Sequence, residues 1–185
     1  MAARPWDDGT MIGASPVTTV SSMTQDKARD SGKLSVEDRL DIMELFAKYA
    51  WALDTGDADG VLACFAEDGY LEHLPQGRFY GEDIRKLLDQ LWYDRPGWYI
   101  GRQHLANHFL ITRQGEDARV KAFFSIVQHH PGDRSNSVFG IGHWDNVCTK
   151  QDGTWLFKAV NVGKWMGEDV PWVGEDRACG PAGGA

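Results

Sequence analysis

Apolar residues recur at helical spacing after residue 35, and this spacing predicts an amphipathic helix over about residues 36–53. Met43, Ala47, Ala50 and Asp54 follow one another at intervals of 4, 3 and 4, so they share one face of that helix. We expect this face to be the buried one. Asp54 therefore occupies a position where an apolar side chain is expected. A buried acid has to be paired, neutralised or used in chemistry.

Two shorter helices are predicted after the first. The segment Ser35-Val-Glu-Asp38 resembles a capping box and marks where the first helix begins. Asp57 is a typical N-cap for a second helix over residues 58–65. A third helix is expected from residue 82 to about residue 93, where apolar residues again recur every three or four positions.

The second half of the chain favours β-strands, because apolar and polar residues alternate along it. A short hairpin is predicted from residues 69–74 and 78–80, and four long strands follow it, at residues 104–112, 118–129, 138–149 and 155–165. Asp152-Gly153, between the last two, is a typical hairpin turn. Three helices followed by these strands predict an α+β fold, with the helices packed on one face of a curved antiparallel sheet.

Composition divides the chain into three parts. Residues 1–33 are rich in Ser, Thr, Gly, Ala and Asp without periodicity, and we expect a mobile N-terminal arm. Residues 34–167 carry all the predicted elements and are expected to form a single domain. Residues 168–185 return to Pro, Gly and Ala, so we expect a loose C-terminal tail.

The net charge indicates which kinds of molecule the protein is expected to bind, and the cysteine content indicates its cellular compartment. The net charge of -8 and the pI near 5.1 argue against nucleic acid and anionic membranes as partners. The sequence has no apolar run of about 18 residues that would span a membrane, and no apolar stretch typical of a signal peptide. Cys64, Cys148 and Cys179 are odd in number and lack metal-ligand spacing, so we expect reduced thiols in a cytoplasmic protein.

Common cofactor signatures are absent from the sequence. It contains no glycine-rich dinucleotide or phosphate loop, no Cys-x-x-Cys motif and no His-Glu-x-x-His motif. We therefore expect no metal and no cofactor, and any catalysis would be acid–base chemistry by side chains. Eight Trp residues and an aromatic content of 11% favour a small aromatic ligand, since planar rings line pockets as well as filling cores.

His104 is the residue best suited to act with Asp54. A His near the end of a strand can face the concave side of a sheet, and an Asp beside it holds one imidazole tautomer and makes a general base near neutral pH. Two alternatives stay open: Asp54 caps the turn before Asp57, and His104 is a half-exposed strand residue. Tyr49 lies roughly 140° from Asp54 round the helix, so it either reaches the same cavity as a donor or packs in the core.

Three more side chains are candidates for binding a substrate. His73 shares a strand face with Leu71, so it lines the cavity if Leu71 is buried. Arg78 and Lys121 are the cations closest to apolar runs, and a half-buried cation would stabilise a phenolate or alkoxide. The alternative is that both cations lie on the solvent face, as such residues more often do.

These motifs together resemble a known family. A helix that ends in Tyr49-x4-Asp54-x-Gly-Asp is followed by Val61-Leu-Ala-Cys-Phe-Ala-Glu-Asp-Gly69, then by Gly-Arg-Phe-Tyr-Gly81, and then by His104 near Asn107. Over about residues 35–166 the chain is similar to the SnoaL-like branch of the nuclear transport factor two superfamily. That superfamily includes scytalone dehydratase and cofactor-free diarylpropane lyases, and also members without catalysis.

The resemblance implies a cone-shaped α+β barrel with a deep pocket between the sheet and the three N-terminal helices. It also implies that Asp54 and His104 form a catalytic pair, with Tyr49 as a third catalytic residue and Asn107 near the substrate. In relatives the His often stands four residues before the Asn. Here the spacing is three, so a β-bulge would be needed to restore the orientation of His104. Relatives form dimers and trimers, and we expect a homo-oligomer, with a trimer favoured over a dimer.

The expected function is a cofactor-independent lyase that acts on a phenolic small molecule. The favoured reaction is loss of a benzylic hydroxyl and release of formaldehyde from a lignin-derived diarylpropane diol. A dehydratase similar to scytalone dehydratase, in which water loss ends the reaction, is one alternative. A non-catalytic binding or assembly subunit is the other, because one fold supports many functions.

Overall fold

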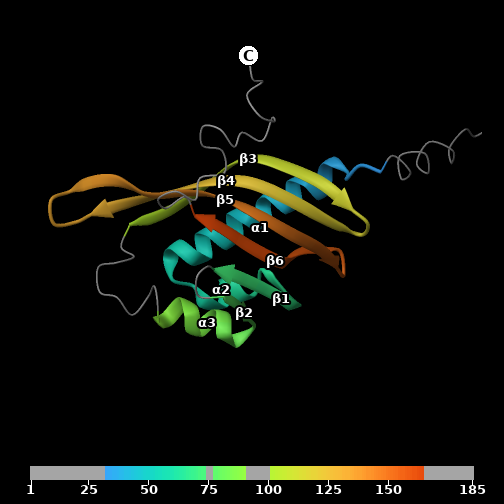
Figure 1. The fold of residues 1–185 in the computed structure, drawn as a ribbon, viewed down its shortest axis with the longest axis horizontal. Coiled ribbons are helices and arrows are strands. Elements are labelled where there is room, and N and C mark those ends of the chain that lie inside the picture. Colours follow the sequence, from blue (N-terminus) through green and yellow to red (C-terminus); the bar gives the residue numbers. More distant parts are fainter. Residues whose placement is uncertain (1–31, 74–76, 91–100, 165–185) are drawn as a thin grey trace, which may run out of the picture. The chain divides into compact units, whose positions relative to one another are not determined.

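The computed structural model describes residues 32–73, 77–90 and 101–164 (Figure 1). The described residues from Lys33 onward belong to one compact unit. The predicted N-terminal arm up to residue 31, the C-terminal tail and the end of the third predicted helix lie outside these ranges. The division of the chain into an arm, a domain and a tail therefore stays a prediction.

The first helix, α1 (Val36–Thr55), begins where the sequence predicts and ends two residues beyond the predicted residue 53, so Asp54 lies in its last turn. The Ser35 hydroxyl accepts a hydrogen bond from the backbone N–H of Asp38 at 3.0 Å, which caps the first turn. Gly56 ends the helix in the left-handed conformation, with φ 79°, and its N–H bonds the carbonyl of Ala52.

The buried face of α1 differs from the predicted one. Met43 is 43% exposed and Ala47 is also exposed. The larger apolar side chains decide which face packs inward, and they lie one position earlier in the helix: Ile42, Leu45, Phe46, Tyr49 and Leu53. Asp54 follows directly after this stripe and is half-buried at its edge.

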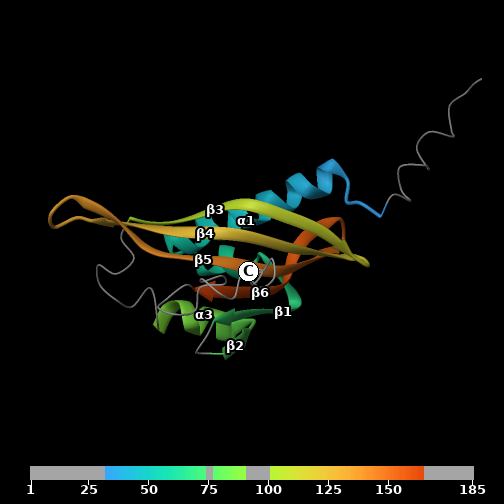
Figure 2. The same ribbon diagram turned by 45° about the horizontal axis from the view of Figure 1, so that its top comes forward.

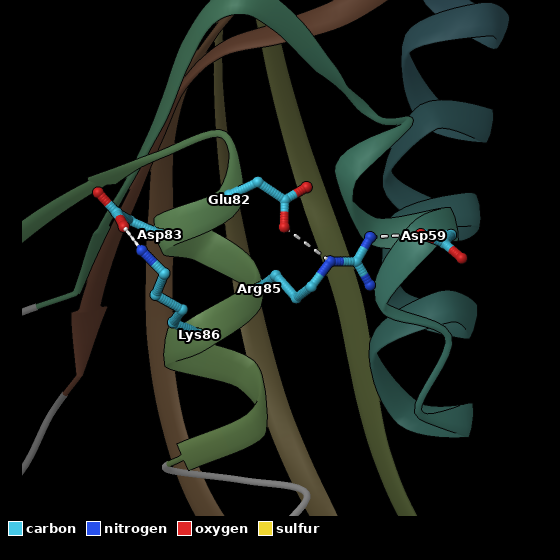
Figure 3. A network of polar contacts seen from close by, with 5 residues as sticks. All are labelled: Asp59, Glu82, Asp83, Arg85 and Lys86. Atoms are coloured by element: carbon cyan, nitrogen blue, oxygen red, sulfur yellow. Dashed lines mark hydrogen bonds and ion pairs between the residues drawn. The ribbon is translucent and has the colours of Figure 1, made fainter.

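The two remaining helices are short. Asp57 caps α2 (Ala58–Leu62) by accepting the Gly60 N–H at 2.9 Å, and the helix is shorter than expected because β1 (Phe65–His73) begins soon after it. α3 covers Glu82–Leu88. Figure 3 shows Arg85 of α3 between Glu82 and Asp59, so one guanidinium joins α3 to α2.

Six strands form one sheet in the order β2-β1-β6-β5-β4-β3. The further strands are β2 (Gly77–Tyr80), β3 (Arg102–Gln114), β4 (Asp117–His130), β5 (Ser135–Gln151) and β6 (Thr154–Lys164). Asp152 and Gly153 make the predicted hairpin turn, with φ 48° and 82°. The α+β class is confirmed, but β1 pairs with β6 in parallel, so the sheet is mixed rather than purely antiparallel.

Figures 1 and 2 both show α1 against one face of the sheet. The buried apolar side chains of α1 and of this face form the core. Phe46 is its centre, with ring centroids of Phe109, Trp144 and Phe157 at 5.2, 5.6 and 5.1 Å. Edge-to-face packing of this kind adds to the stabilisation from burial alone. These aromatic contacts hold α1 against the inner face of the sheet, which fixes where the end of α1 meets β3.

Asp38 ties the other end of α1 to the last hairpin. Its carboxylate accepts hydrogen bonds from Trp155 Nε1 at 2.8 Å and from Lys150 Nζ at 2.7 Å. Burial raises the pKa of Asp38, but the hydrogen bonds from Lys150, Trp155 and Ser35 together outweigh it and lower the pKa to about 2.

The first prediction concerns this anchor. Because the pKa of Asp38 is lower in the folded than in the unfolded chain, its stabilisation is present above about pH 4 and is lost as the pH falls toward about 2. We expect Asp38→Asn to lower the free energy of unfolding by about 1–2 kcal/mol at neutral pH, measured by urea denaturation. The difference from the wild type should shrink as the medium is acidified.

Asp83→Asn is the matched control. Asp83 bonds Lys86 at 2.6 Å on the surface of α3, where both side chains are more than half exposed, so its loss should change stability by less than about 0.5 kcal/mol (Figure 3). An Asp38→Asn effect that stays constant from neutral to acidic pH would contradict the assigned role of the carboxylate.

Candidate active site

Asp54 and His104 form a two-point contact between the last turn of α1 and the start of β3. Asp54 Oδ1 lies 2.6 Å from His104 Nδ1, and Asp54 Oδ2 accepts the backbone N–H of His104, also at 2.6 Å. The side chains are only 14% and 11% exposed. Gly56 and Asp57 make the turn and the next cap without Asp54, so the turn-cap alternative is wrong.

The contact fixes the chemistry of the imidazole. An ionised carboxylate can only accept hydrogen bonds, so Nδ1 of His104 carries a proton and Nε2 of the neutral ring keeps its lone pair. The second bond, from the backbone N–H, prevents the carboxylate from turning away. His104 is therefore held in the tautomer and orientation that a general base or acid requires.

The residues that lie beside His104 across the sheet are apolar or small. The residues in register across β4 and β5 are Ile126 and Gly140, and Ile126 is buried on the inner face. A Cβ atom at Gly140 would meet only Ile126 Cδ1, at 3.8 Å. The ring of Phe124 follows in the next row, with its centroid 6.5 Å from that of His104. The inner surface next to the imidazole is thus apolar and partly aromatic.

Tyr49, the third predicted catalytic residue, packs in the core. It is 3% exposed, and its ring centroid lies 5.4 Å from Phe157, 6.1 Å from Phe65 and 6.2 Å from Trp144. These edge contacts account for its position by packing. A catalytic role for its hydroxyl stays a prediction.

His73 lies where the alternation along its strand predicts. Leu71 is 0% and His73 is 6% exposed, so both face inward from β1. His73 is in register with Val162 of β6, which in turn is in register with Trp144 of β5. His73 therefore belongs to the inner surface, and its contact with a substrate stays a prediction.

The two cations predicted for the site lie on the other face of the sheet. Arg78 bonds Glu72 at 2.9 Å and lies over the ring of Tyr70, 4.6 Å from its centre. Lys121 is exposed and in register with Asp145 of β5. The structure does not bring either cation to His104, because the strands that carry them turn these positions outward.

Asn107 is also turned away from His104. It is in register with Phe123, which alternates with the buried Phe124, and it bonds the His108 ring at 2.6 Å. The expected bulge comes after Asn107 and not before it: the register shifts between Asn107 and Leu110, where His108 has φ 53°. The orientation of His104 comes from Asp54 instead.

Arg102 is the cation that the sequence prediction missed. It is 5% exposed and lies two residues before His104, on the same face of β3. Its Nε donates to Gln128 Oε1 at 2.8 Å, and its guanidinium lies over the Phe139 ring, 4.1 Å from the centre. The sequence signal that points to it is its spacing of two from His104, which places both residues on one face of a strand.

A separate groove of about 670 Å³ follows the opposite side of α1. Trp51, which is 73% exposed, Lys48 and Cys64 are among its lining residues, and neither Asp54 nor His104 belongs to it. Burial raises the pKa of Cys64 to about 11 and that of Cys148 to about 12, so neither thiol is a ready nucleophile. The described ranges contain no cluster of three metal-binding side chains and no helix that is long and apolar enough to cross a membrane.

Comparison with known protein families shows the family of this chain. Residues 34–161 match the family model of the SnoaL-like domain. The chain belongs to the SnoaL-like domain family. Uncharacterized proteins of Mycobacterium tuberculosis (Rv2910c) and Mycobacterium bovis (Mb2934c) are each 26% identical to it over 132 residues, which cover 69% of this chain and 86% of theirs.

Solved structures share the fold of this SnoaL-like protein. A nuclear transport factor two-like protein with a cystatin-like fold from Novosphingobium aromaticivorans has a TM-score of 0.66 at 20% identity, covering 81% of this chain and 94% of its own. A candidate scytalone dehydratase from the same species has a TM-score of 0.60 at 22% identity, covering 81% and 96%. ActVI-ORFA from Streptomyces coelicolor has a TM-score of 0.62 at 18% identity, covering 68% and 96%. The fold and family are consistent with an enzyme that processes a small molecule without a cofactor.

The second prediction concerns the tautomer of His104. We expect heteronuclear nitrogen NMR to show the neutral ring protonated on Nδ1 and unprotonated on Nε2, because Asp54 accepts the Nδ1 proton. Asp54→Ala should remove this preference. His130, on the exposed β4–β5 hairpin, is the internal reference, because its ring nitrogen Nε2 bonds the Ser137 hydroxyl at 2.9 Å and not a carboxylate. A neutral His104 protonated on Nε2 would contradict the assigned geometry.

Proposed function

We propose that this SnoaL-like protein is a cofactor-independent lyase that acts on a phenolic small molecule by acid–base chemistry. The observation that carries the proposal is the Asp54–His104 contact, which leaves Nε2 as the reactive nitrogen in a largely buried position. The aromatic and apolar inner surface beside it, with Phe124 and Ile126, suits a flat aromatic ring. The favoured substrate is a lignin-derived diarylpropane diol.

The first step removes water. His104, protonated on Nε2, donates that proton to the benzylic hydroxyl of the substrate. The bond between the benzylic carbon and this oxygen breaks, and the electrons of the substrate phenolate move through the ring to give a quinone methide and water. His104 is left neutral, with Asp54 still bonded to Nδ1.

The second step removes formaldehyde and restores the enzyme. Neutral Nε2 takes the proton of the terminal hydroxymethyl group, and the carbon–carbon bond to that group breaks. The hydroxymethyl carbon leaves as formaldehyde, and the released electron pair forms a new carbon–carbon double bond and returns the ring oxygen to phenolate. His104 ends protonated, as it began, so the cycle needs no oxidant, reductant or metal.

A dehydratase is the second candidate, and the structural similarity to a candidate scytalone dehydratase favours it. It would use the same pair and stop after water loss. A non-catalytic binding or assembly subunit is the third. In that case, Asp54 and His104 would bind a ligand without moving a proton.

The proposal also covers the oligomeric state of the protein and its location in the cell. We propose a homo-oligomer, a trimer before a dimer, in the cytoplasm, without nucleic acid or membrane partners. The apolar residues Leu105, Leu110 and Ile141, on the outer face of β3 and β5, are 47%, 67% and 42% exposed and support the use of this face between subunits.

The third prediction is the response of turnover to loss of the pair. His104→Ala and Asp54→Ala are each expected to lower kcat/KM for a phenolic diarylpropane diol by about 10²–10⁴-fold, because each removes the proton carrier or its orientation. The assay follows the stilbene product by absorbance and formaldehyde by chemical trapping. Equal amounts of both identify the deformylating lyase, and water loss without formaldehyde identifies the dehydratase.

His130→Ala is the control, since His130 lies on an exposed hairpin and should leave turnover unchanged. Circular dichroism establishes that each variant is folded. The lyase proposal fails if the wild type turns over none of the phenolic diols, or if removing metals with a chelator abolishes turnover.

A further inference from the structure

We infer that Arg102 is a positioning residue of the active site: with Gln128 and Phe139 it fixes the start of β3, so that His104 stays in contact with Asp54. The structural part of this inference stands on the geometry of the strands alone. Its consequence for catalysis rests on the proposed function, in which His104 moves the proton. In this role Arg102 acts through His104 and does not touch the substrate.

The start of β3 lies at the edge of the sheet. In the described sheet β3 is the last strand and pairs with β4. His104 is the third residue of β3. The ends of an edge strand open more readily than the interior of a sheet. Opening at this end would draw the His104 N–H away from Asp54 Oδ2, to which it bonds at 2.6 Å.

The backbone pattern explains why side chains are needed to hold this end. Successive residues of an antiparallel strand point their N–H groups alternately toward and away from the neighbouring strand. The His104 N–H points away from β4, because it bonds the carboxylate at the end of α1, and Arg102 two residues earlier is in the same phase. The preceding pair, Gly101 and His129, bonds through the backbone at 3.2 Å. Arg102 and Gln128, opposite each other in the register, are instead joined by their side chains.

The side chain of Arg102 reaches across two strands. Its Nε donates to Gln128 Oε1 of β4 at 2.8 Å, and Gln128 Nε2 donates to the carbonyl of His129, also at 2.8 Å. Its guanidinium lies over the ring of Phe139 of β5, 4.1 Å from the centre. The register of β4 with β5 shifts at Phe139, and a bulge of this kind redirects a side chain. One arginine thus connects β3 to both of the next two strands.

Burial strengthens the bond between Arg102 and Gln128. The two residues are 5% and 4% exposed. A hydrogen bond from a charged donor is stronger where water is excluded, and its loss leaves a buried acceptor unsatisfied. Removal of the Arg102 donor is therefore expected to loosen the start of β3.

A loose strand end has a direct consequence for proton transfer. A displacement of about 1 Å at a catalytic group can cost about 10²-fold in rate. Separation of the first residues of β3 from β4 would weaken the contact between His104 and Asp54. The chemical step would slow, whereas contacts that bind the substrate elsewhere would remain. We therefore expect a lower kcat and little change in KM.

The test observes His104 by NMR and needs no substrate. Arg102→Met keeps the length of the side chain but removes the donor, and Arg102→Lys keeps a donor. In Arg102→Met we expect the His104 backbone amide to exchange with solvent at least about tenfold faster, and the preference for a proton on Nδ1 to weaken. Arg102→Lys should recover part of both properties. The amide of the buried Val160, on the central strand β6, reports overall stability, so exchange at His104 should rise well beyond any change at Val160.

Two further variants control the test. Arg113→Met is the matched control, because Arg113 lies on the same strand but is exposed and bonds the carbonyl of Gly115. It should leave His104 unchanged. Phe139→Leu keeps the inference testable if Arg102→Met does not fold, since Phe139 is 47% exposed and its loss leaves the core filled. It removes the ring over the guanidinium and should speed exchange at His104 by about two- to fivefold.

Three results would overturn the inference. One is a folded Arg102→Met in which the amide and the tautomer of His104 match the wild type. Another is a rise in exchange at Val160 as large as that at His104, because Arg102 would then stabilise the whole domain and not this strand end. The third, if Arg102→Met does not fold, is unchanged exchange at His104 in Phe139→Leu.

Turnover of the phenolic diol separates this inference from the proposed function. If the wild type is active, Arg102→Met should lower kcat by about tenfold or more, with KM within about twofold of the wild type and partial recovery in Arg102→Lys. If the wild type turns over no diol while Arg102→Met disturbs His104, the positioning role stands and the lyase proposal fails. If the wild type and folded Arg102→Met turn over the diol equally, the lyase proposal stands and the positioning role is wrong.

Discussion

One carboxylate connects the helical layer to the sheet at the point where chemistry is proposed. Asp54, at the end of α1, accepts both the ring N–H and the backbone N–H of His104, at the start of β3. The bond to the ring N–H fixes the rotation of the imidazole, and the bond to the backbone N–H fixes the rotation of the carboxylate. Together the two bonds hold both groups in one orientation. The contact is possible only because the aromatic core around Phe46 holds α1 against the sheet.

The inner face of the sheet carries an aromatic core at one end and His104 at the other. Toward the middle of α1, rings such as Trp144 and Phe157 fill the interior and make a rigid core. Toward β3 and the start of β5, the same face carries the small Gly140 and the buried Arg102. His104 therefore lies where the aromatic core gives way to smaller and polar residues.

Local sequence patterns predicted the elements well and the inward-facing residues less well. Caps at Ser35 and Asp57 and the turn at Asp152-Gly153 depend only on neighbouring residues, and all three are confirmed. The buried face of α1 was misplaced at Met43 because side-chain size, not spacing alone, decides which face packs. The parallel pairing of β1 with β6 depends on contacts distant in sequence, which no local pattern contains.

In the candidate site, too, some residues could be predicted from the sequence and others could not. Asp54 and His104 were paired in the prediction because an acid on an apolar face needs a partner, and the structure brings them together. Arg78 and Lys121 were misplaced because alternation gives the period of a strand but not which face is inward. Arg102 was missed although its spacing of two from His104 places it on the same strand face, because spacing alone does not show that a charged residue is buried.

The most direct test of this account is a crystal structure with a bound, unreactive phenolic diol analogue. The account predicts the benzylic oxygen within about 2.6–3.2 Å of His104 Nε2, with Asp54 still bonded to Nδ1. An analogue bound only in the groove beside Trp51, or with its benzylic oxygen beyond hydrogen-bond reach of Nε2, would contradict the claim that this pair moves the proton.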